Sequence, residues 1–233
     1  MKAVLLAAGR GERLKSLTMH CPKPMMIVDN RPIIVHNIEM CKSFGITDIL
    51  INLHYMPEKI VRYLGNGERL GVKIIYKYEP VLLGTAGAIK NFADQLSDER
   101  FLVIYADNIS NYNLKRIRDR HIELSADMTM ALFNLTDVSQ SGIAILDDTD
   151  VIRAFIEKPT IQNIPSHWVN AGVYILEPEL ISAIPLGFSD FGKDIIPRFI
   201  ADKKKIVGVK MERNVTAIDT PELYRQVVKR TST

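Results

Sequence analysis

The sequence predicts an α/β fold with a mostly parallel, mixed β-sheet flanked by helices. Short apolar runs bounded by glycine or polar turn residues, at 3–8, 48–55 and 101–108, are typical of buried strands. Helical patterns lie between them at 32–44 and 57–64, each with proline near its start and glycine after its end. This alternation of strand and helix is the rhythm of a parallel α/β sheet.

The rest of the chain continues the same pattern. Segment 141–159 is predicted as a β-hairpin, because two alternating strands are joined by Asp-Asp-Thr-Asp. The other predicted strands are 72–79, 128–135, 168–178 and 205–211, and the other predicted helices are 86–96, 113–124, 178–184, 189–202 and 221–230. A length of 233 residues, 47% of them hydrophobic, suits one large domain with a substantial core.

The composition argues against several functional classes of protein. The formal net charge of +3 gives no sign of the clustered basic stripe that a nucleic-acid surface needs. Cys21 and Cys41 show no metal-ligand spacing, and we expect reduced thiols in a cytoplasmic protein. The apolar N-terminal run is too short for a signal peptide, and no run approaches the length of a membrane span.

The first loop carries the strongest functional pattern. The strand at 3–8 ends at Gly9, and Gly11, Arg13 and the proline-flanked Lys23 follow. Bare backbone and two cations at a strand end predict a polyphosphate cradle, although the glycines alone would indicate only a tight turn. The P-loop spacing is absent, and the dinucleotide fingerprint is broken where Leu14 replaces its third glycine.

Two later segments add to this pattern. Gly84 and Thr85 lie between a strand and a helix, where bare backbone can bind the edge of a base or ribose, or form only a turn. The strand at 101–108 ends in Asp107-Asn108. Ligands of open parallel sheets bind outside the carboxyl ends of strands, so Asp107 is a candidate Mg²⁺ ligand as well as a candidate turn cap.

LAAGRGERL at 6–14, followed by Pro-Lys-Pro at 22–24, resembles the signature of sugar-1-phosphate nucleotidylyltransferases, also called NDP-sugar pyrophosphorylases. The loop at 83–88 is most similar to those of mannose- and heptose-1-phosphate guanylyltransferases. The resemblance implies a Rossmann-like fold of the nucleotide-diphospho-sugar transferase type in a single domain, 1–233. Its nucleotide-binding part would span about 1–135 and its sugar-phosphate-binding part about 136–225, with the hairpin as an insertion. No C-terminal β-helix domain is expected.

The family reaction joins a nucleoside triphosphate to a sugar 1-phosphate and releases pyrophosphate. The residues that the resemblance marks as catalytic are Arg13, Lys23, Asp107 and Lys158. Those that it marks as nucleotide-binding are Leu6, Ala8, Gly9, Gly11, Arg13, Lys23, Gly84, Thr85 and Asp107. Those that it marks as sugar-phosphate-binding are Gly142, Glu157, Lys158, Asn170 and Gly172.

The resemblance also implies Mg²⁺ held by two carboxylates. Asp107 is the first, with Ala106 where relatives usually have glycine, a replacement that requires a negative φ. Asp219 is the candidate for the second. Aligning the chain on Thr220-Pro221 would instead place Ala217 at that position, but chelation needs an acid.

The substrates stay open at this point. We expect GTP with a mannose- or heptose-type 1-phosphate, while UTP, dTTP or CTP with another sugar, and a phosphocholine-type cytidylyl transfer, are alternatives. A non-catalytic subunit that senses nucleotide sugars is a further alternative, and a hydride-transferring dinucleotide enzyme is a distant one. We expect no nucleic-acid or membrane partner, and pairing into a homodimer stays open.

Overall fold

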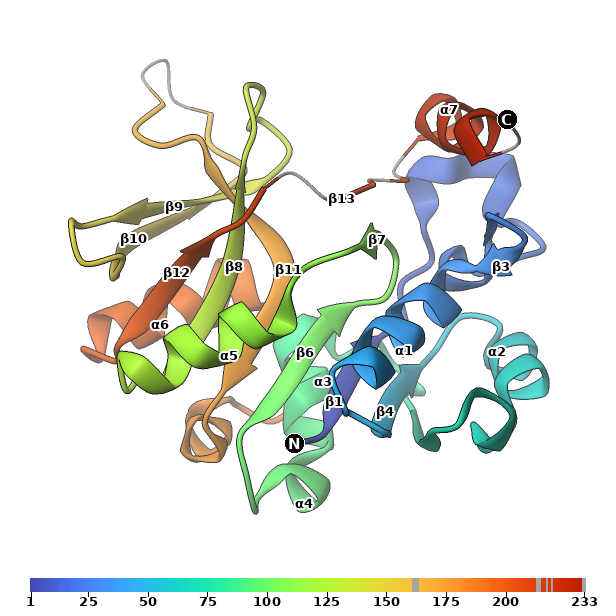
Figure 1. Ribbon diagram of the computed structural model, residues 1–233, viewed down its shortest axis with the longest axis horizontal. Helices are drawn as coiled ribbons and strands as arrows, with labels where there is room; N and C mark the ends of the chain where they lie inside the picture. Colours follow the sequence, from blue (N-terminus) through green and yellow to red (C-terminus); the bar gives the residue numbers. More distant parts are fainter. Residues whose placement is uncertain (161–163, 213–214, 217, 219, 232–233) are drawn as a thin grey trace. The chain divides into compact units, whose positions relative to one another are not determined.

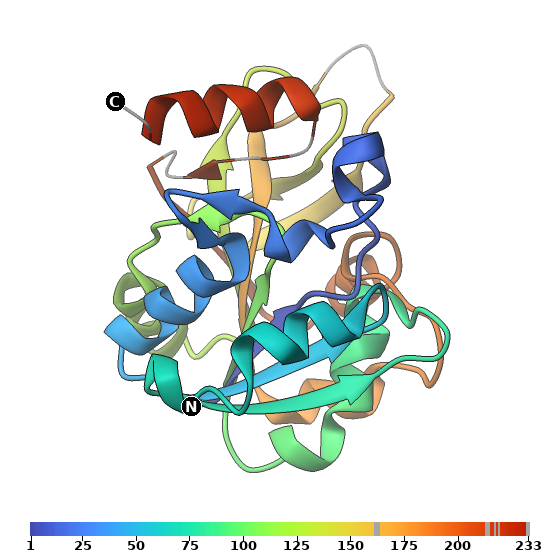
Figure 2. The same cartoon turned by 90° about the vertical axis from the view of Figure 1, so that its right-hand side faces the viewer.

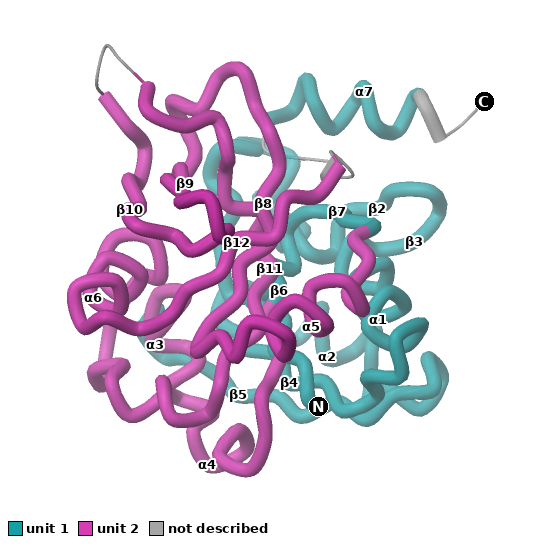
Figure 3. The backbone as a smooth tube through the Cα atoms, turned by 60° about the vertical axis from the view of Figure 1, so that its left-hand side comes forward, with its two compact units in different colours: residues 1–82, 104–111, 215–233 teal, residues 83–103, 112–214 magenta. Residues whose placement is uncertain are grey.

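The computed structural model describes residues 1–160, 164–212, 215–216, 218 and 220–231 (Figure 1). It divides into two compact units that interleave along the chain (Figure 3). The first comprises residues 1–82, 104–111 and 215–233, and the second comprises residues 83–103 and 112–214. Among the described residues, no helix combines the length and the apolar character needed to cross a membrane.

The first unit contains a parallel sheet. Strand β4 (Asp48–Leu53) lies between β1 (Ala3–Leu6) and β5 (Lys73–Tyr78) and is parallel to both. The crossovers contain the helices α1 (Ile33–Ser43) and α2 (Pro57–Leu64), as parallel connections require (Figure 2). The apolar run of β1, and that of residues 49–51 in β4, fit strands that are covered on both faces.

The first unit also contains short elements. They are the helical turns η1 (Glu12–Thr18), η2 (Lys23–Met25) and η3 (Glu68–Leu70), the strand pairs β2 (Ile27–Val28) with β3 (Arg31–Pro32) and β7 (Ile109–Ser110) with β13 (Val215–Thr216), and helix α7 (Pro221–Thr231). Helix α7 packs against η1 and β2 (Figure 2). Leu14, Met26 and Ile218 belong to the buried cluster beneath these elements.

The second unit contains a mixed sheet. The hairpin of β9 (Gly142–Leu146) and β10 (Ile152–Glu157) joins β11 (Trp168–Leu176) through β9. Strand β11 also pairs antiparallel with β8 (Met128–Asn134), which pairs parallel with β12 (Ile206–Lys210). Its helices are α3 (Gly84–Asn91), α4 (Ala93–Leu96), α5 (Leu114–Glu123) and α6 (Ile196–Ala201), with the helical turns η4 (Pro178–Ala183) and η5 (Phe191–Ile195). Strand β6 (Phe101–Tyr105) contributes residues to both units.

The predicted α/β class, with a mostly parallel mixed sheet and flanking helices, is confirmed, and so is the hairpin. Two predicted helices differ in detail. Segment 86–96 is split at Phe92 into α3 and α4, and α3 begins earlier, at Gly84. Segment 189–202 opens with the wide turn η5, and regular helix begins only at Ile196. Pro197 lacks an amide hydrogen, so it cannot make the helical hydrogen bond to residue 193.

Candidate functional site

The loop after β1 is shaped by two glycines with different surroundings. Gly11 has a φ of +65°, and a Cβ there would lie 3.0 Å from Cβ of Lys23, so a side chain would strain the turn and press on the lysine. A Cβ on Gly9 would meet nothing within 4 Å. The absence of a side chain at Gly9 therefore serves no packing need among the described residues, and it leaves bare backbone at the strand end.

Lys23 and Asp107 are brought together from positions 84 residues apart. The Lys23 Nζ donates to Asp107 Oδ2 at 2.9 Å, and the lysine side chain is 4% exposed whereas the aspartate is 37% exposed. The amide Nδ2 of Asn108 donates to the other carboxylate oxygen at 3.1 Å. This arrangement combines a buried cation with an accessible carboxylate.

The backbone explains why Asp107 reaches this place. Ala106 N donates to the Leu6 carbonyl at 3.1 Å, which joins the segment after β6 to the end of β1. Ala106 is fully buried, and its φ lies outside the left-handed region, so alanine is compatible with this position. The predicted loop and the predicted carboxylate therefore lie at one sheet edge within the first unit.

A buried polar chain that the sequence analysis missed supports the same loop. Ala7 N donates to Asn52 Oδ1 at 2.8 Å, and Asn52 Nδ2 donates to Glu79 Oε1 at 2.8 Å. Asn52 is 3% exposed and Glu79 is 1% exposed. The signal available in the sequence was an asparagine inside the otherwise apolar segment 49–53. The pair fixes the backbone immediately after β1.

The described residues contain one of the two predicted metal ligands, and the metal site stays a prediction. Asp219 lies outside them, and none of them form a cluster of three or more His, Cys, Asp or Glu that could hold a metal ion. Asp107 alone suits Mg²⁺, which proteins often hold with one or two carboxylates while substrate phosphates and waters complete its shell. Arg13 lies exposed in η1, on the loop of the two glycines.

In the second unit, the loop at Gly84 and Thr85 is fastened to segment 188–192. The Thr85 hydroxyl donates to Asp190 Oδ2 at 2.8 Å and accepts from Phe191 N at 2.8 Å. The Ser189 carbonyl accepts from the amides of residues 86 and 87 at 3.0 and 3.1 Å. A Cβ on Gly84, whose φ is +74°, would lie 2.4 Å from that carbonyl oxygen. The glycine is thus required by close packing against segment 188–192.

The same segment reaches Glu157 at the end of the hairpin. A Cβ on Gly142 would lie 2.5 Å from Glu157 Oε2, and one on Gly192 would lie 2.4 Å from it. The carboxylate therefore occupies the space that two glycines leave open. Burial, and then the charge of Asp190, raise the pKa of Glu157 above its ordinary value. Asp190 contacts Thr85 and influences Glu157, yet the sequence analysis did not select it.

The other predicted residues of the second unit lie on strained or irregular backbone. Lys158 is exposed, has a φ of +49°, and donates its amide to the Ser141 carbonyl at 3.1 Å. Such a φ is unfavourable for a side-chain-bearing residue and is found disproportionately at functional sites. Asn170 lies beside an irregularity in β11, where its Oδ1 accepts from Gly172 N at 2.9 Å and its Nδ2 donates to the Tyr174 hydroxyl at 2.6 Å.

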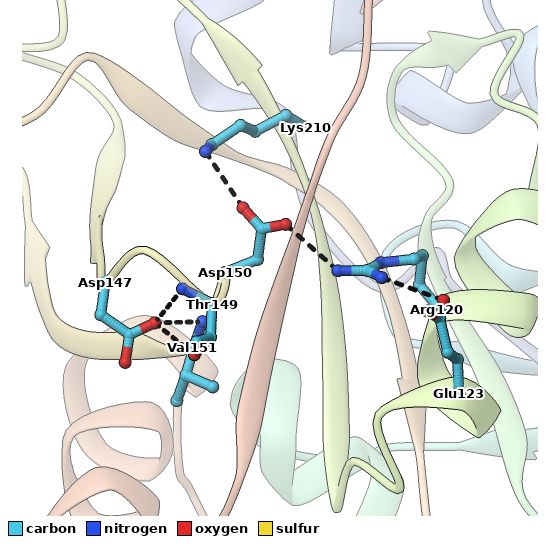
Figure 4. Close-up of polar contacts among 7 residues, drawn as sticks. All are labelled: Arg120, Glu123, Asp147, Thr149, Asp150, Val151 and Lys210. Carbon is cyan, nitrogen blue, oxygen red and sulfur yellow. Dashed lines mark hydrogen bonds and ion pairs between the residues drawn. The ribbon is translucent and has the colours of Figure 1, made fainter.

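The far end of the hairpin is held by charged groups (Figure 4). Asp147 Oδ1 accepts from the amides of Thr149 and Val151 at 2.9 and 3.0 Å and closes the turn. Asp150 accepts from Arg120 of α5 at 3.2 Å and from Lys210 of β12 at 3.0 Å. The turn is therefore tied to two other elements, which limits the freedom of the strand that carries Glu157.

Comparisons with known proteins agree with this geometry. A family model described as nucleotidyl transferase matches residues 2–215. A probable mannose-1-phosphate guanylyltransferase from Oryza sativa is 34% identical over 87% of this chain and 57% of its own length. A UTP–glucose-1-phosphate uridylyltransferase from Synechocystis is 30% identical over 98% of this chain and 63% of its own length. The chain thus spans less than two thirds of these relatives.

Solved structures share the fold. A putative glucose-1-phosphate thymidylyltransferase from Bacillus anthracis has a TM-score of 0.88 at 24% identity, covering 99% of this chain and 95% of its own. HddC from Yersinia pseudotuberculosis, also solved in complex with GMP-PN, has a TM-score of 0.83 at 26% identity and covers 98% of both chains. The motif order along the sequence and the family match over nearly the whole chain lead to one conclusion: the chain belongs to the nucleotidyl transferase family.

Proposed function

We propose that the protein is a sugar-1-phosphate nucleotidylyltransferase, which converts a nucleoside triphosphate and a sugar 1-phosphate into a nucleotide sugar and pyrophosphate. The observation that carries this proposal is the pairing of Lys23 with Asp107 at 2.9 Å, beside the glycine loop. A buried cation and an accessible carboxylate at one strand end suit a polyphosphate and its counter-ion. The enzyme assignment follows the family, and the Oryza sativa and Synechocystis relatives named above both bear transferase names.

In the proposed reaction a phosphate oxygen of the sugar 1-phosphate attacks the α-phosphorus of the nucleotide in line. The new O–P bond forms as the bond to the β-phosphate oxygen breaks, and pyrophosphate carries away the electron pair. The nucleophile is already an anion, so no general base is required. The barrier arises mainly from bringing two anions together, which positioning and fixed cations overcome.

We assign the roles by residue type. Lys23 neutralises the phosphates next to the attacked phosphorus, and Arg13 neutralises the departing pyrophosphate. Lys158 orients the nucleophilic phosphate, and its left-handed backbone supports a functional constraint at that position. Leu6, Ala8, Gly9, Gly11, Gly84 and Thr85 complete the proposed nucleotide-binding set. Gly142, Glu157, Asn170 and Gly172 complete the proposed sugar-binding set. Both sets belong to one proposed catalytic domain.

We propose Mg²⁺ as the metal, held by Asp107 and by Asp219. When bound, the ion neutralises phosphate charge and polarises the reacting phosphate. Asp107 is suited to this because more than a third of its side chain is exposed and it bears two oxygens. Lys23 donates to one of those oxygens, so the lysine also orients the carboxylate.

We propose GTP and a mannose- or heptose-type 1-phosphate as the substrates. The guanylyltransferase names of the rice and Saccharomyces cerevisiae relatives, each 34% identical, support this choice. The uridylyltransferase relative aligns with 98% of the chain, which makes UTP with glucose 1-phosphate the second candidate.

The test is pyrophosphate release in Mg²⁺, measured for GTP, UTP, dTTP, CTP and ATP against mannose, glucose and heptose 1-phosphates. One strong combination of GTP with a manno-configured sugar is expected. Asp107→Asn, which keeps the shape and removes the charge, serves as the inactive control. A grid without activity, from folded protein that still binds a nucleotide, would refute the catalytic proposal and favour a sensing subunit.

A further inference from the structure

A cavity of about 620 Å³ lies on the first unit. Neither the glycines of the loop after β1 nor Asp107 is among its lining residues. Helix α2 lines it with Lys59, Arg62 and Tyr63, and η3 contributes Arg69. Met25, in the turn that begins at Lys23, completes one wall, and two leucines form apolar lining. The volume is that of a site for a small organic molecule.

The charged residues that line this cavity are all positive. None of its lining residues is acidic, and within the described chain Lys59, Arg62 and Arg69 take part in no ion pair. Lys59 donates to the His20 carbonyl, and Arg69 donates to the Tyr63 carbonyl at 2.5 Å. The Arg62 side chain makes no hydrogen bond to any described residue. Three cations facing one cavity without a carboxylate favour an anionic occupant.

The other lining residues indicate which class of anion the cavity would bind. The Tyr63 side chain is 43% exposed, and Met25 is partly buried beside it. An inorganic anion would leave these apolar surfaces unused, whereas an organic phosphate covers them and places its phosphate at the cations. We propose that this cavity binds a phosphate monoester of a small organic molecule, such as a sugar phosphate or a nucleoside monophosphate.

The cavity is connected to the segment that leads to Lys23. Lys59 holds the His20 carbonyl, and the Tyr55 hydroxyl donates to the carbonyls of Thr18 and Met19 at 3.0 and 3.3 Å. A phosphate that recruits Lys59 weakens its bond to His20, three residues before Lys23. Occupancy is therefore expected to alter turnover, and this coupling alone rests on the proposed function.

Binding is tested by calorimetric titration of the full chain with glucose 6-phosphate, AMP and inorganic phosphate. The key variant is the double change Arg62→Gln and Arg69→Gln, and Arg198→Gln, an exposed arginine of α6 in the other unit, is the control for loss of one surface cation. Lys23→Ala distinguishes the cavity from the proposed phosphate cradle. Binding of one organic phosphate is expected, weakened roughly tenfold or more in the double variant.

The outcomes separate the possibilities. Retention of binding in Lys23→Ala and Arg198→Gln, with loss in the double variant, supports the cavity, and preference for glucose 6-phosphate or AMP identifies the source of the phosphate. Loss only in Lys23→Ala assigns the ligand to the cradle and overturns the proposal. Equal, weak binding by all variants, or preference for inorganic phosphate, also overturns it. Calorimetric titration measures binding without turnover. The binding result can therefore be interpreted even if the protein does not catalyse nucleotidyl transfer.

Discussion

Replacing Thr85 with valine tests how the loop after β5 is held. Valine has nearly the same shape, but it removes the donor to Asp190 Oδ2 and the acceptor for Phe191 N, both at 2.8 Å. Each hydrogen bond contributes about 1 kcal/mol, so the free energy of unfolding is expected to fall by about 2 kcal/mol. For a chain of this size the melting temperature then falls by roughly 4–8 °C.

Urea unfolding of the parent protein, Thr85→Val and Thr85→Ser gives the answer. Serine keeps the hydroxyl, so it should retain most of the stability that valine loses. The KM for the nucleotide should rise in the valine variant, because the loop that carries Gly84 is no longer fixed to Asp190. A valine variant as stable as the serine variant would show that these two bonds do not hold the loop.

Three further predictions follow from other parts of the molecule. Lys23→Ala and Asp107→Ala should each lower pyrophosphate release by at least ~10²-fold, the size expected for one lost charge stabiliser, while near-normal rates would contradict their roles. Gly9→Ala should leave the urea midpoint unchanged but reduce activity, whereas Gly11→Ala should lower stability by about 1 kcal/mol, since only Gly11 has a positive φ and close neighbours. Burial lowers the pKa of His121 below its ordinary value of 6.5. The unfolded chain then binds this proton more readily, so unfolding free energy should fall as pH drops below about 6.5, a slope that His121→Gln should reduce.

The elements predicted best were those with strong local patterns. Segment 57–64 is a helix with the predicted bounds because proline suits its first turn and Gly65 follows its last residue. Strand 101–108 was predicted too long. The strand ends at Tyr105, and Asp107 lies in the turn beyond, where its carboxylate meets Lys23.

The candidate site residues also divide into those with a local sequence signal and those without one. Gly11, Lys23 and Asp107 could be selected because glycine, a cation and a strand-end acid carry local signals. Asp190 could not, because its importance comes from contacts with Thr85, 105 residues earlier, and from its closeness to Glu157. A long-range hydrogen bond leaves no periodicity in the sequence from which it could be inferred.

The packing of the Glu157 side chain has a consequence for engineering and for evolutionary change. Its carboxylate fills volume left by the missing side chains of Gly142 and Gly192, so the three positions share one space. At Gly192 an added methyl group displaces the acid, and shortening the acid opens a void that the methyl group could fill, whereas at Gly142 the added group also meets the Phe155 ring, 2.4 Å away. Changes at Glu157 and Gly192 should therefore be strongly epistatic, because each is harmful singly and the paired change is tolerated better than either.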